Sequence, residues 1–266
     1  MIQPDQDALQ WDAYVDAYEQ VFETLTDGFN RAALDLLAPL AGRDLLDVAA
    51  GAGAAAIEAA SRGARVTAVD GSAAMVARIA ARGAGRLAAR QADAVALPFP
   101  NAAFDAALSS FGVVLLPDPA RGLAELHRVL RPGGRVAIVT WTEPHRYEVA
   151  TRLRDAVTAV RGAPPPMGEL PAQLRFTDPD RLHALLADAG FGPVRIERVE
   201  SALHAASAAA LAGALGFAPG MTAMLDALGP DRGAVLRRFA DALAADQGPG
   251  PVRLGAVAHI AAAVRP

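Results

Sequence analysis

A glycine-rich turn directly after a short apolar run places the tightest constraint on what this chain can fold into. The run from Asp44 to Ala49 has strand character and breaks at Gly51 and Gly53, and an alanine-rich helical segment follows at 54–62. A strand, a tight turn and a helix N-terminus in this order let backbone N–H groups approach a ligand closely. The turn therefore predicts a ligand site at the end of this strand.

Strands and helices alternate after the turn. We expect strands at 45–49, 64–69, 86–89, 104–110 and 135–141, with helices at 54–62, 72–82 and 119–130 between them. Repeated strand–helix units with short turns predict a parallel sheet with right-handed crossovers, which binds ligands at the carboxyl ends of its strands. With two later strands at 194–199 and 252–264, the sequence predicts an α/β, Rossmann-like, doubly wound and mostly parallel seven-stranded sheet.

Helical segments flank this core. Residues 5–38 carry apolar side chains at helical spacing, with Tyr14 and Tyr18 on one expected face. Residues 202–247 are rich in Ala, Leu and Met, and they predict helices inserted before the last strand. We expect one domain over 1–266, with N-terminal helices at 1–40, a ligand-binding core at 41–145, and a substrate-side half at 146–266 that contains the insertion at about 202–250. The insertion is placed to form a lid over a pocket or to extend the core.

Composition excludes several kinds of site. The chain has no cysteine and no lysine, which excludes disulfides, thiolate nucleophiles, Cys-ligated zinc and lysine Schiff bases. A net charge of -4 without a basic run disfavours a nucleic-acid substrate. No apolar run reaches the ~20 residues of a membrane span, and the acidic, polar N-terminus is unlike a secretory signal, so we expect a cytoplasmic location. No group of histidines and acids has metal-ligand spacing, so no metal is expected.

Two cofactors compete for the glycine turn. The run from Gly51 to Ala56 fits the G-x-G-x-x-A form of the dinucleotide fingerprint, and Asp70 ends the next strand, where a ribose-binding acid is expected. Asp47 argues against a dinucleotide, because that fold normally has an apolar residue inside the strand. A buried carboxylate there needs donors, which a zwitterionic ligand with an ammonium group would supply. Asp93 follows the third strand and is placed to accept a hydrogen bond from an adenine amino group.

Several short stretches occur in an informative order. They are Leu46–Gly53, Val69-Asp70, Asp93-Ala94, Phe104-Asp105 and Leu130–Gly134, together with Ser110–Val113, Pro117-Asp118-Pro119 and Val139-Thr140-Trp141. This series resembles that of class I S-adenosylmethionine (SAM)-dependent methyltransferases, and within them it is most similar to the small-molecule group related to ubiquinone/menaquinone-biosynthesis methyltransferases. The resemblance covers about residues 10–145, and 146–250 match nothing specific. Ala49 stands where the family often has glycine, a tolerable replacement.

The resemblance implies SAM as cofactor, S-adenosylhomocysteine (SAH) as product, and a role for each matching residue. Asp47 helps to hold the methionine ammonium, Asp70 binds the ribose hydroxyls with both carboxylate oxygens, and Asp93 binds the adenine amino group. The other implied cofactor contacts are Ala49, Gly51, Gly53, Gly71, Met75, Ala94, Ser109 and Ser110, with Tyr14 and Tyr18 closing over SAM from the N-terminal helix.

SAM carries an activated methyl group, so such a protein mainly has to align an acceptor in a dry pocket. The stretch from Ser109 to Gly112 is not the Asn/Asp-Pro-Pro-aromatic motif of methyltransferases that act on nucleobase or amide nitrogens. This leaves oxygen or carbon of a small molecule, an acceptor that usually needs a general base. His145, beside Glu143 after the fifth strand, is the first candidate for that base, and His204, at the start of the insertion, is the second.

An apolar stripe in the insertion bears on the acceptor. It consists of Leu211, Leu215, Phe217, Met221, Met224, Leu225 and Leu228. The stripe fits either core packing or a wall for a bulky apolar metabolite such as a polyketide, quinone or terpenoid. The leading hypothesis is a SAM-dependent O- or C-methyltransferase of a hydrophobic metabolite, as a monomer or homodimer. A SAM-binding protein that catalyses cyclisation or rearrangement is the alternative. A NAD-dependent oxidoreductase is more remote, because the chain has Asp47 and no lysine.

Overall fold

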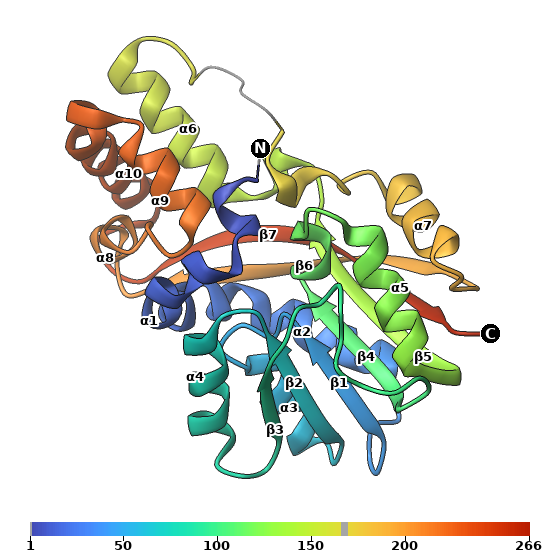
Figure 1. Cartoon of the computed structure of the whole chain (residues 1–266). Coiled ribbons are helices and arrows are strands. Elements are labelled where there is room, and N and C mark those ends of the chain that lie inside the picture. The colour runs from blue at the N-terminus through green and yellow to red at the C-terminus, as the bar shows by residue number, and fades with distance from the viewer. Residues whose placement is uncertain (1, 166–169) are drawn as a thin grey trace.

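A seven-stranded sheet organises the computed structural model, which describes residues 2–165 and 170–266 (Figure 1). The strands are β1 (Asp44–Val48), β2 (Arg65–Asp70), β3 (Ala88–Gln91), β4 (Phe104–Ser110), β5 (Leu130–Trp141), β6 (Arg195–Ala205) and β7 (Val252–Val264). Their order is β3-β2-β1-β4-β5-β7-β6, and β1 to β5 run parallel while β7 is antiparallel to both β5 and β6. The predicted Rossmann-like, mostly parallel sheet is confirmed.

Helices cover both faces of the sheet. They are α1 (Val15–Ala17), α2 (Glu23–Leu37), α3 (Ala54–Ser61), α4 (Ala73–Gly83), α5 (Pro119–Val129), α6 (Glu148–Arg161), α7 (Pro179–Asp188), α8 (Ala208–Gly213), α9 (Pro219–Asp226) and α10 (Arg232–Gln247). Figure 1 shows α6, α8, α9 and α10 grouped at one end of the sheet, and α5 and α7 together at the other. Within the described ranges, no helix has the length and apolar character needed to cross a membrane.

The sheet has a hydrophobic core on each face, and successive side chains of β1 point alternately into one and the other. Leu45 belongs to the core cluster that includes residues of α2, α3, α6 and the inserted helices, whereas Leu46 and Val48 belong to the cluster that includes residues of α5 and α7. Side chains of a strand point alternately to its two faces. Asp47 therefore projects toward the helices α2 and α3, the side on which the N-terminal segment folds over the sheet.

Local sequence signals explain where the core helices begin. Ser72 precedes α4, and its hydroxyl accepts a hydrogen bond from the Met75 N–H at 3.1 Å, as expected for an N-cap. Asp118 caps α5 in the same way, and Pro119 takes the first helical position, where no N–H is needed. These caps fix the starts of the two helices. The helix α4 begins directly after the carboxyl end of β2, and α5 begins after the loop that follows β4.

The N-terminal segment is helical but less regular than its spacing predicts. It has short 3-10 turns at Pro4–Gln6 and Ala8–Tyr14, then α1, a π-helical turn at Tyr18–Phe22, and finally α2. The hydrogen-bonding pattern therefore changes three times along this segment. The π turn widens the helix at Tyr18 and Phe22, and such turns occur often at functional sites.

The start of the insertion differs from the prediction. β6 continues to Ala205, whereas the sequence predicted its end at Val199 and helices from 202. The reason is tertiary pairing, since β6 and β7 pair residue by residue from Arg195 opposite Ala262 to Ala205 opposite Val252. This ladder satisfies the backbone hydrogen bonds and overrides the helical preference of Ala and Leu. The inserted helices are α8, α9 and α10.

Candidate functional site

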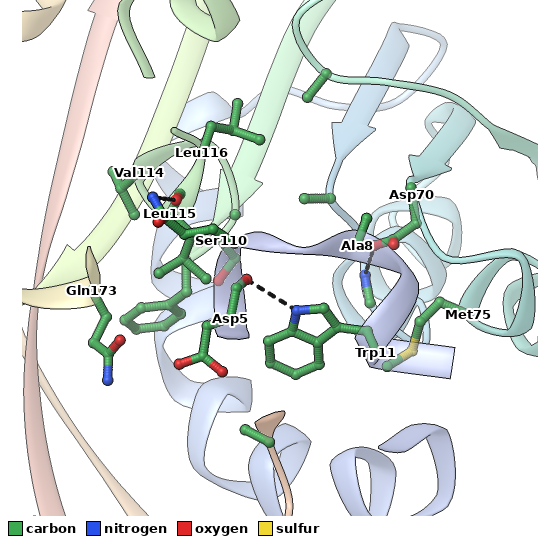
Figure 2. A pocket seen from close by; sticks show the side chains of 18 of the residues that line it. Asp5, Ala8, Trp11, Asp70, Met75, Ser110, Val114, Leu115, Leu116 and Gln173 are labelled. Atoms are coloured by element: carbon green, nitrogen blue, oxygen red, sulfur yellow. Dashed lines mark hydrogen bonds between the residues drawn. The ribbon is translucent and has the colours of Figure 1, made fainter. Parts of the chain in front are cut away.

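A cavity of about 700 Å³ opens at the carboxyl ends of the parallel strands (Figure 2). Ala49 and Gly51 follow β1, Asp70 ends β2, Gln91 ends β3 and Ser110 ends β4, and all five line it. Ligands bind open α/β sheets at this edge, where the strand order reverses. The glycine turn and the reversal between β1 and β4 therefore meet at one site.

The carboxylate of Asp70 holds the glycine turn in place. Its Oδ2 accepts a hydrogen bond from the Gly51 N–H and its Oδ1 from the Ser72 N–H, both at 2.9 Å. Burial raises the pKa of Asp70 to about 6, and the backbone N–H donors oppose that rise. Each oxygen keeps a second lone pair, so the side chain remains able to accept from a ligand at the cavity wall.

Tyr18 covers the turn from the N-terminal side. Gly51 has a φ of +58°, and a Cβ built on it would lie 2.7 Å from the Tyr18 hydroxyl oxygen. Only glycine combines this backbone conformation with such a close approach. Burial, with nearby Glu23, Asp70 and Asp47, raises the pKa of Tyr18, so its hydroxyl stays protonated and available as a donor.

Asp47 is a buried carboxylate with an unsatisfied oxygen. The residue is 1% exposed, and its Oδ2 has no hydrogen-bond partner among the described residues. Burial raises its pKa to about 7, with a further contribution from the charge of Asp70. Asp47 lines a small cavity beside the main one, together with Asn30 of α2 and Ser110.

The small cavity collects three such atoms. Asn30 Oδ1 and Ser110 Oγ, like Asp47 Oδ2, are buried without a partner in the described part of the chain. Tyr18, Ala49 and Ser110 line both cavities, so the small one adjoins the main one. Buried polar atoms are normally hydrogen-bonded, and three unpaired ones at one place indicate a ligand group that is rich in donors.

Aromatic side chains form the wall opposite the glycine turn. Phe22 stacks on Phe217 at 5.7 Å between ring centroids, Phe111 packs on Trp141 at 4.3 Å, and Trp141 stacks on Tyr147 at 4.8 Å with an interplanar angle of 13°. All five line the cavity. Such a wall suits a flat, apolar molecule.

The Tyr147 hydroxyl is the polar point of this wall. Its oxygen is buried and has no partner within the described residues, and burial raises the pKa of the phenol. The hydroxyl is therefore a donor at neutral pH. An unpaired buried hydroxyl costs about 1–3 kcal/mol.

The structure brings most of the predicted site residues together. Those that line the main cavity are Tyr18, Ala49, Gly51, Asp70, Gly71, Met75, Asp93, Ala94 and Ser110. Figure 2 shows Asp70 and Met75 on one side of this space and Val114 and Gln173 on the other. Asp93 is exposed at the rim, where its Oδ1 accepts from the Val95 N–H at 3.0 Å.

Three other predicted cofactor residues lie outside that lining. Gly53 precedes α3 and faces Ile79, which a Cβ on it would approach to 3.0 Å. Ser109 is buried and donates to the Val48 carbonyl at 2.8 Å while accepting from the Val113 N–H at 2.9 Å, so it fixes the turn after β4. Tyr14 packs edge-on against Trp11 at 6.5 Å, and Tyr18 packs edge-on against the same ring at 5.8 Å.

The predicted general bases are also placed elsewhere. His145, in a short 3-10 turn after β5, and His204, near the end of β6, are both exposed, and neither lines the cavity. His204 is not in the insertion at all, because β6 extends past it. His127 of α5 packs edge-on against Phe191 at 5.1 Å. Among the described residues no histidine lines the cavity.

Sequence reasoning missed the residues that complete the cavity. These are Asp5, Gln6, Trp11, Phe22, Phe111, Trp141, Tyr147 and Gln173, with Asn30 in the small cavity. Their spacing is that of ordinary core positions, so no local signal separates them from packing residues. The predicted apolar stripe divides: Phe217 and Met221 line the cavity, Leu211, Leu215, Leu225 and Leu228 are core, and Met224 is 44% exposed.

Comparison with known proteins identifies the family. A family model described as a methyltransferase domain matches residues 46–138. A demethylmenaquinone methyltransferase of Mycolicibacterium vanbaalenii is 32% identical over 222 residues, a match that covers 77% of this chain and 96% of that protein. The chain belongs to the ubiquinone/menaquinone-type family of class I SAM-dependent methyltransferases. Its cofactor is SAM.

Two further comparisons delimit this assignment. A demethylmenaquinone methyltransferase of Clavibacter sepedonicus is 38% identical over 147 residues, which cover 53% of this chain and 60% of that protein. The match thus spans about three fifths of that relative's length. The crystal structure of the [4+2]-cyclase SpnF superposes with a TM-score of 0.57 at 24% identity over 90% of this chain and 81% of that one. That likeness is one of fold.

The residues fit the cofactor of the family. The methionine end of SAM carries an ammonium group with three N–H bonds. The small cavity presents three unpaired atoms that can accept them, from Asn30, Asp47 and Ser110. Asp70 would hold the ribose, and Asp93 and Ala94 line the main cavity where the family places adenine. Asn30 is an addition that the motifs alone did not indicate.

The raised pKa of Asp47 predicts a pH-dependent stability of the ligand-free protein. The pKa of Asp47 is about 7 in the folded protein and has its ordinary value of 3.8 in the unfolded chain, so the folded state binds the proton more tightly. The free energy of unfolding should therefore fall as pH rises from 4 to 7, by up to about 4 kcal/mol, and stay level above that. Asp47→Asn should remove this loss in urea unfolding, whereas Asp188→Asn, an exposed change on α7, should not. Identical pH profiles for wild type and Asp47→Asn would contradict the burial argument.

The raised pKa of Asp47 also predicts that ligand binding depends on pH. An ammonium group favours the ionised form of Asp47, so SAH has to displace the proton below pH 7. Affinity for SAH should rise by up to about tenfold per unit as pH increases toward 7, and binding in that range should release a proton. Asp47→Asn should bind SAH weakly at every pH, without proton release. Calorimetry in buffers of different ionisation enthalpy measures both quantities. Binding without proton release by the wild type would contradict the pairing.

Proposed function

We propose that this chain transfers a methyl group from SAM to an oxygen or carbon of a hydrophobic, oxygen-bearing small molecule of the quinone type. The observation that carries the proposal is the continuity of the cavity, which joins the glycine turn to the aromatic wall around Trp141 and Tyr147. A cofactor and a flat acceptor can therefore share one space. The names of the relatives, which act on demethylmenaquinone, support the choice of acceptor.

The cofactor supplies the activated methyl group when bound, and the protein's task is to position and desolvate. Asp47, Asn30 and Ser110 anchor the ammonium, and Asp70 anchors the ribose at the glycine turn. Tyr18 closes this side, since its ring lies directly against Gly51. These contacts leave the aromatic side of the cavity open to the acceptor.

The aromatic wall selects the acceptor. Phe22, Phe217 and Trp141 offer ring faces and edges to an apolar ring system. The Tyr147 hydroxyl offers one donor, which favours an acceptor that carries an oxygen over a pure hydrocarbon. A reduced naphthoquinone ring meets both conditions and is a suitable test substrate.

Removal of the ribose anchor tests the cofactor half of the proposal. Asp70→Ala should weaken SAH binding by about 100-fold or more, because two charge-assisted hydrogen bonds are lost. It should also abolish methyl transfer to 1,4-naphthoquinol, followed by mass spectrometry as the gain of one methyl group. Asp188→Ala, on α7 and outside the cavity, is the control. Undiminished SAH affinity in Asp70→Ala would contradict the assigned site, and SAH binding by the wild type without transfer to any phenolic acceptor would favour a non-methylating reaction.

Removal of the single hydroxyl tests the acceptor half. Tyr147→Phe should raise the KM for 1,4-naphthoquinol about five- to tenfold and leave SAH affinity unchanged, since one hydrogen bond to the acceptor is lost. Its ligand-free stability should equal or exceed that of the wild type, because an unpaired buried hydroxyl is removed. Tyr14→Phe, outside the cavity, is the matched control. An unchanged KM in Tyr147→Phe would show that the acceptor does not reach this hydroxyl.

A further inference from the structure

The cavity contains few groups that can exchange a proton with an acceptor. Its ionisable lining side chains, within the described residues, are Asp5, Tyr18, Asp70, Asp93, Asp118, Arg121 and Tyr147. Both tyrosines have a pKa raised by burial and act as donors. Asp70 is engaged by the glycine turn, and Asp93, Asp118 and Arg121 lie where the chain leaves β3 and enters α5, the adenine side. Asp5 is the carboxylate that remains on the acceptor side.

Contacts on two sides fix Asp5 at this position. Its Oδ1 accepts a hydrogen bond from the Gly220 N–H in the first turn of α9 at 2.6 Å. Its backbone carbonyl accepts from Trp11 Nε1 at 3.1 Å, as Figure 2 shows. The rest of the N-terminal strap (residues 3–22) is tied down as well, for example by the hydrogen bond from Gln6 Nε2 to the Leu115 carbonyl at 2.9 Å.

One oxygen of this carboxylate is left without an assigned partner. The Gly220 N–H engages Oδ1, whereas no hydrogen bond to Oδ2 is formed within the described residues. A Cβ on Gly220 would lie 2.3 Å from Oδ2, so this contact requires glycine. Phe217, three residues before Gly220, and Met221, directly after it, line the acceptor side, which places Asp5 at the junction of the N-terminal strap and the aromatic wall.

The environment of Asp5 suits proton exchange. Burial raises its pKa above the ordinary value, and the Gly220 N–H works in the opposite direction. A raised pKa makes a carboxylate a stronger base than one in water. Asn at this position would keep the size and one acceptor oxygen for Gly220, but it would be unable to take a proton.

We propose that Asp5 is the general base of the reaction and accepts the proton of the acceptor's phenolic hydroxyl at Oδ2. The O–H bond of the acceptor breaks as its proton moves to the carboxylate. The electron pair left on the acceptor, on oxygen or on the adjacent ring carbon, forms the bond to the methyl carbon. The pair of the broken C–S bond stays on sulfur, which gives SAH. Attack by oxygen gives the methyl ether directly. Attack by the ring carbon first gives a ring ketone, whose carbonyl oxygen takes the proton back from Asp5 while the methylated carbon loses its own proton to solvent. This inference rests on the proposed function, and it adds a residue and a role that the family motifs lack.

A chromophoric phenol tests the contact without any turnover. We would titrate 4-nitrophenol bound to the SAH complex and follow its phenol and phenolate absorbance. The wild-type carboxylate disfavours a bound phenolate, so the apparent pKa of the bound probe should be higher, by about one unit or more, in wild type than in Asp5→Asn. Asp7→Asn, the same change two residues along the strap and outside the cavity, should titrate like the wild type. Equal titration in wild type and Asp5→Asn would overturn the assignment of Asp5.

Transfer rates provide the second measurement. In single turnover with 1,4-naphthoquinol, Asp5→Asn should be about 100-fold slower or more, with unchanged SAH affinity and melting temperature. Transfer to 4-nitrophenol above the pKa of the bound probe needs no base, and there Asp5→Asn should keep most of the wild-type rate. Loss of both rates alike, or of neither, would overturn the role of Asp5. Failure of the wild type to bind or methylate either phenol would instead overturn the proposed acceptor, and the base with it.

Discussion

A buried carboxylate with an unpaired oxygen is the constraint on which the site depends. Asp47 lies inside a central strand, points toward α2 and α3, and is almost fully removed from solvent. No arginine forms an ion pair with it among the described residues. Burial of an unpaired charge is costly, so the ligand-free protein favours the protonated acid. A ligand that brings an ammonium group removes this cost, which couples binding to the ionisation of Asp47.

The glycine turn lies at the same edge of the sheet, and it lets a ligand approach the protein backbone closely. Asp70 fixes the turn through the N–H groups of Gly51 and Ser72, and Tyr18 packs on the face that a side chain at Gly51 would fill. This side of the site is therefore held by backbone hydrogen bonds at the ends of β1 and β2 and by the packing of Tyr18. The other side is assembled from distant segments, since the N-terminal strap contacts the loop after β4 through Gln6 and α9 through Asp5.

This division explains which parts of the site were predictable. Strand β4, the N-cap Ser72 and the placement of Asp70 and Ser110 follow from local patterns, because each depends on residues a few positions away. The base could not be found in this way. His145 was a plausible choice by chemistry and by its position after β5, yet it is exposed, while Asp5 reaches the cavity only because the strap folds back onto α9. Tyr147 could not be predicted either. An aromatic residue at the start of a helix has the pattern of a core residue, and only the fold shows that it stacks on Trp141 at the cavity.

By itself, the sequence determined the alternation of strands and helices and the glycine turn with its two acids, and hence a ligand site at the carboxyl edge of a parallel sheet. The ordered series of motifs identified SAM as the ligand through its resemblance to class I methyltransferases. Periodicity and turn chemistry act over a few residues, so they are readable without the fold. Tertiary structure alone decided that β6 extends to Ala205, that Asn30 joins Asp47, and that Asp5 and Tyr147 face one cavity. Each of these depends on which distant segments pack together, and that is settled by burial and backbone pairing across the whole chain.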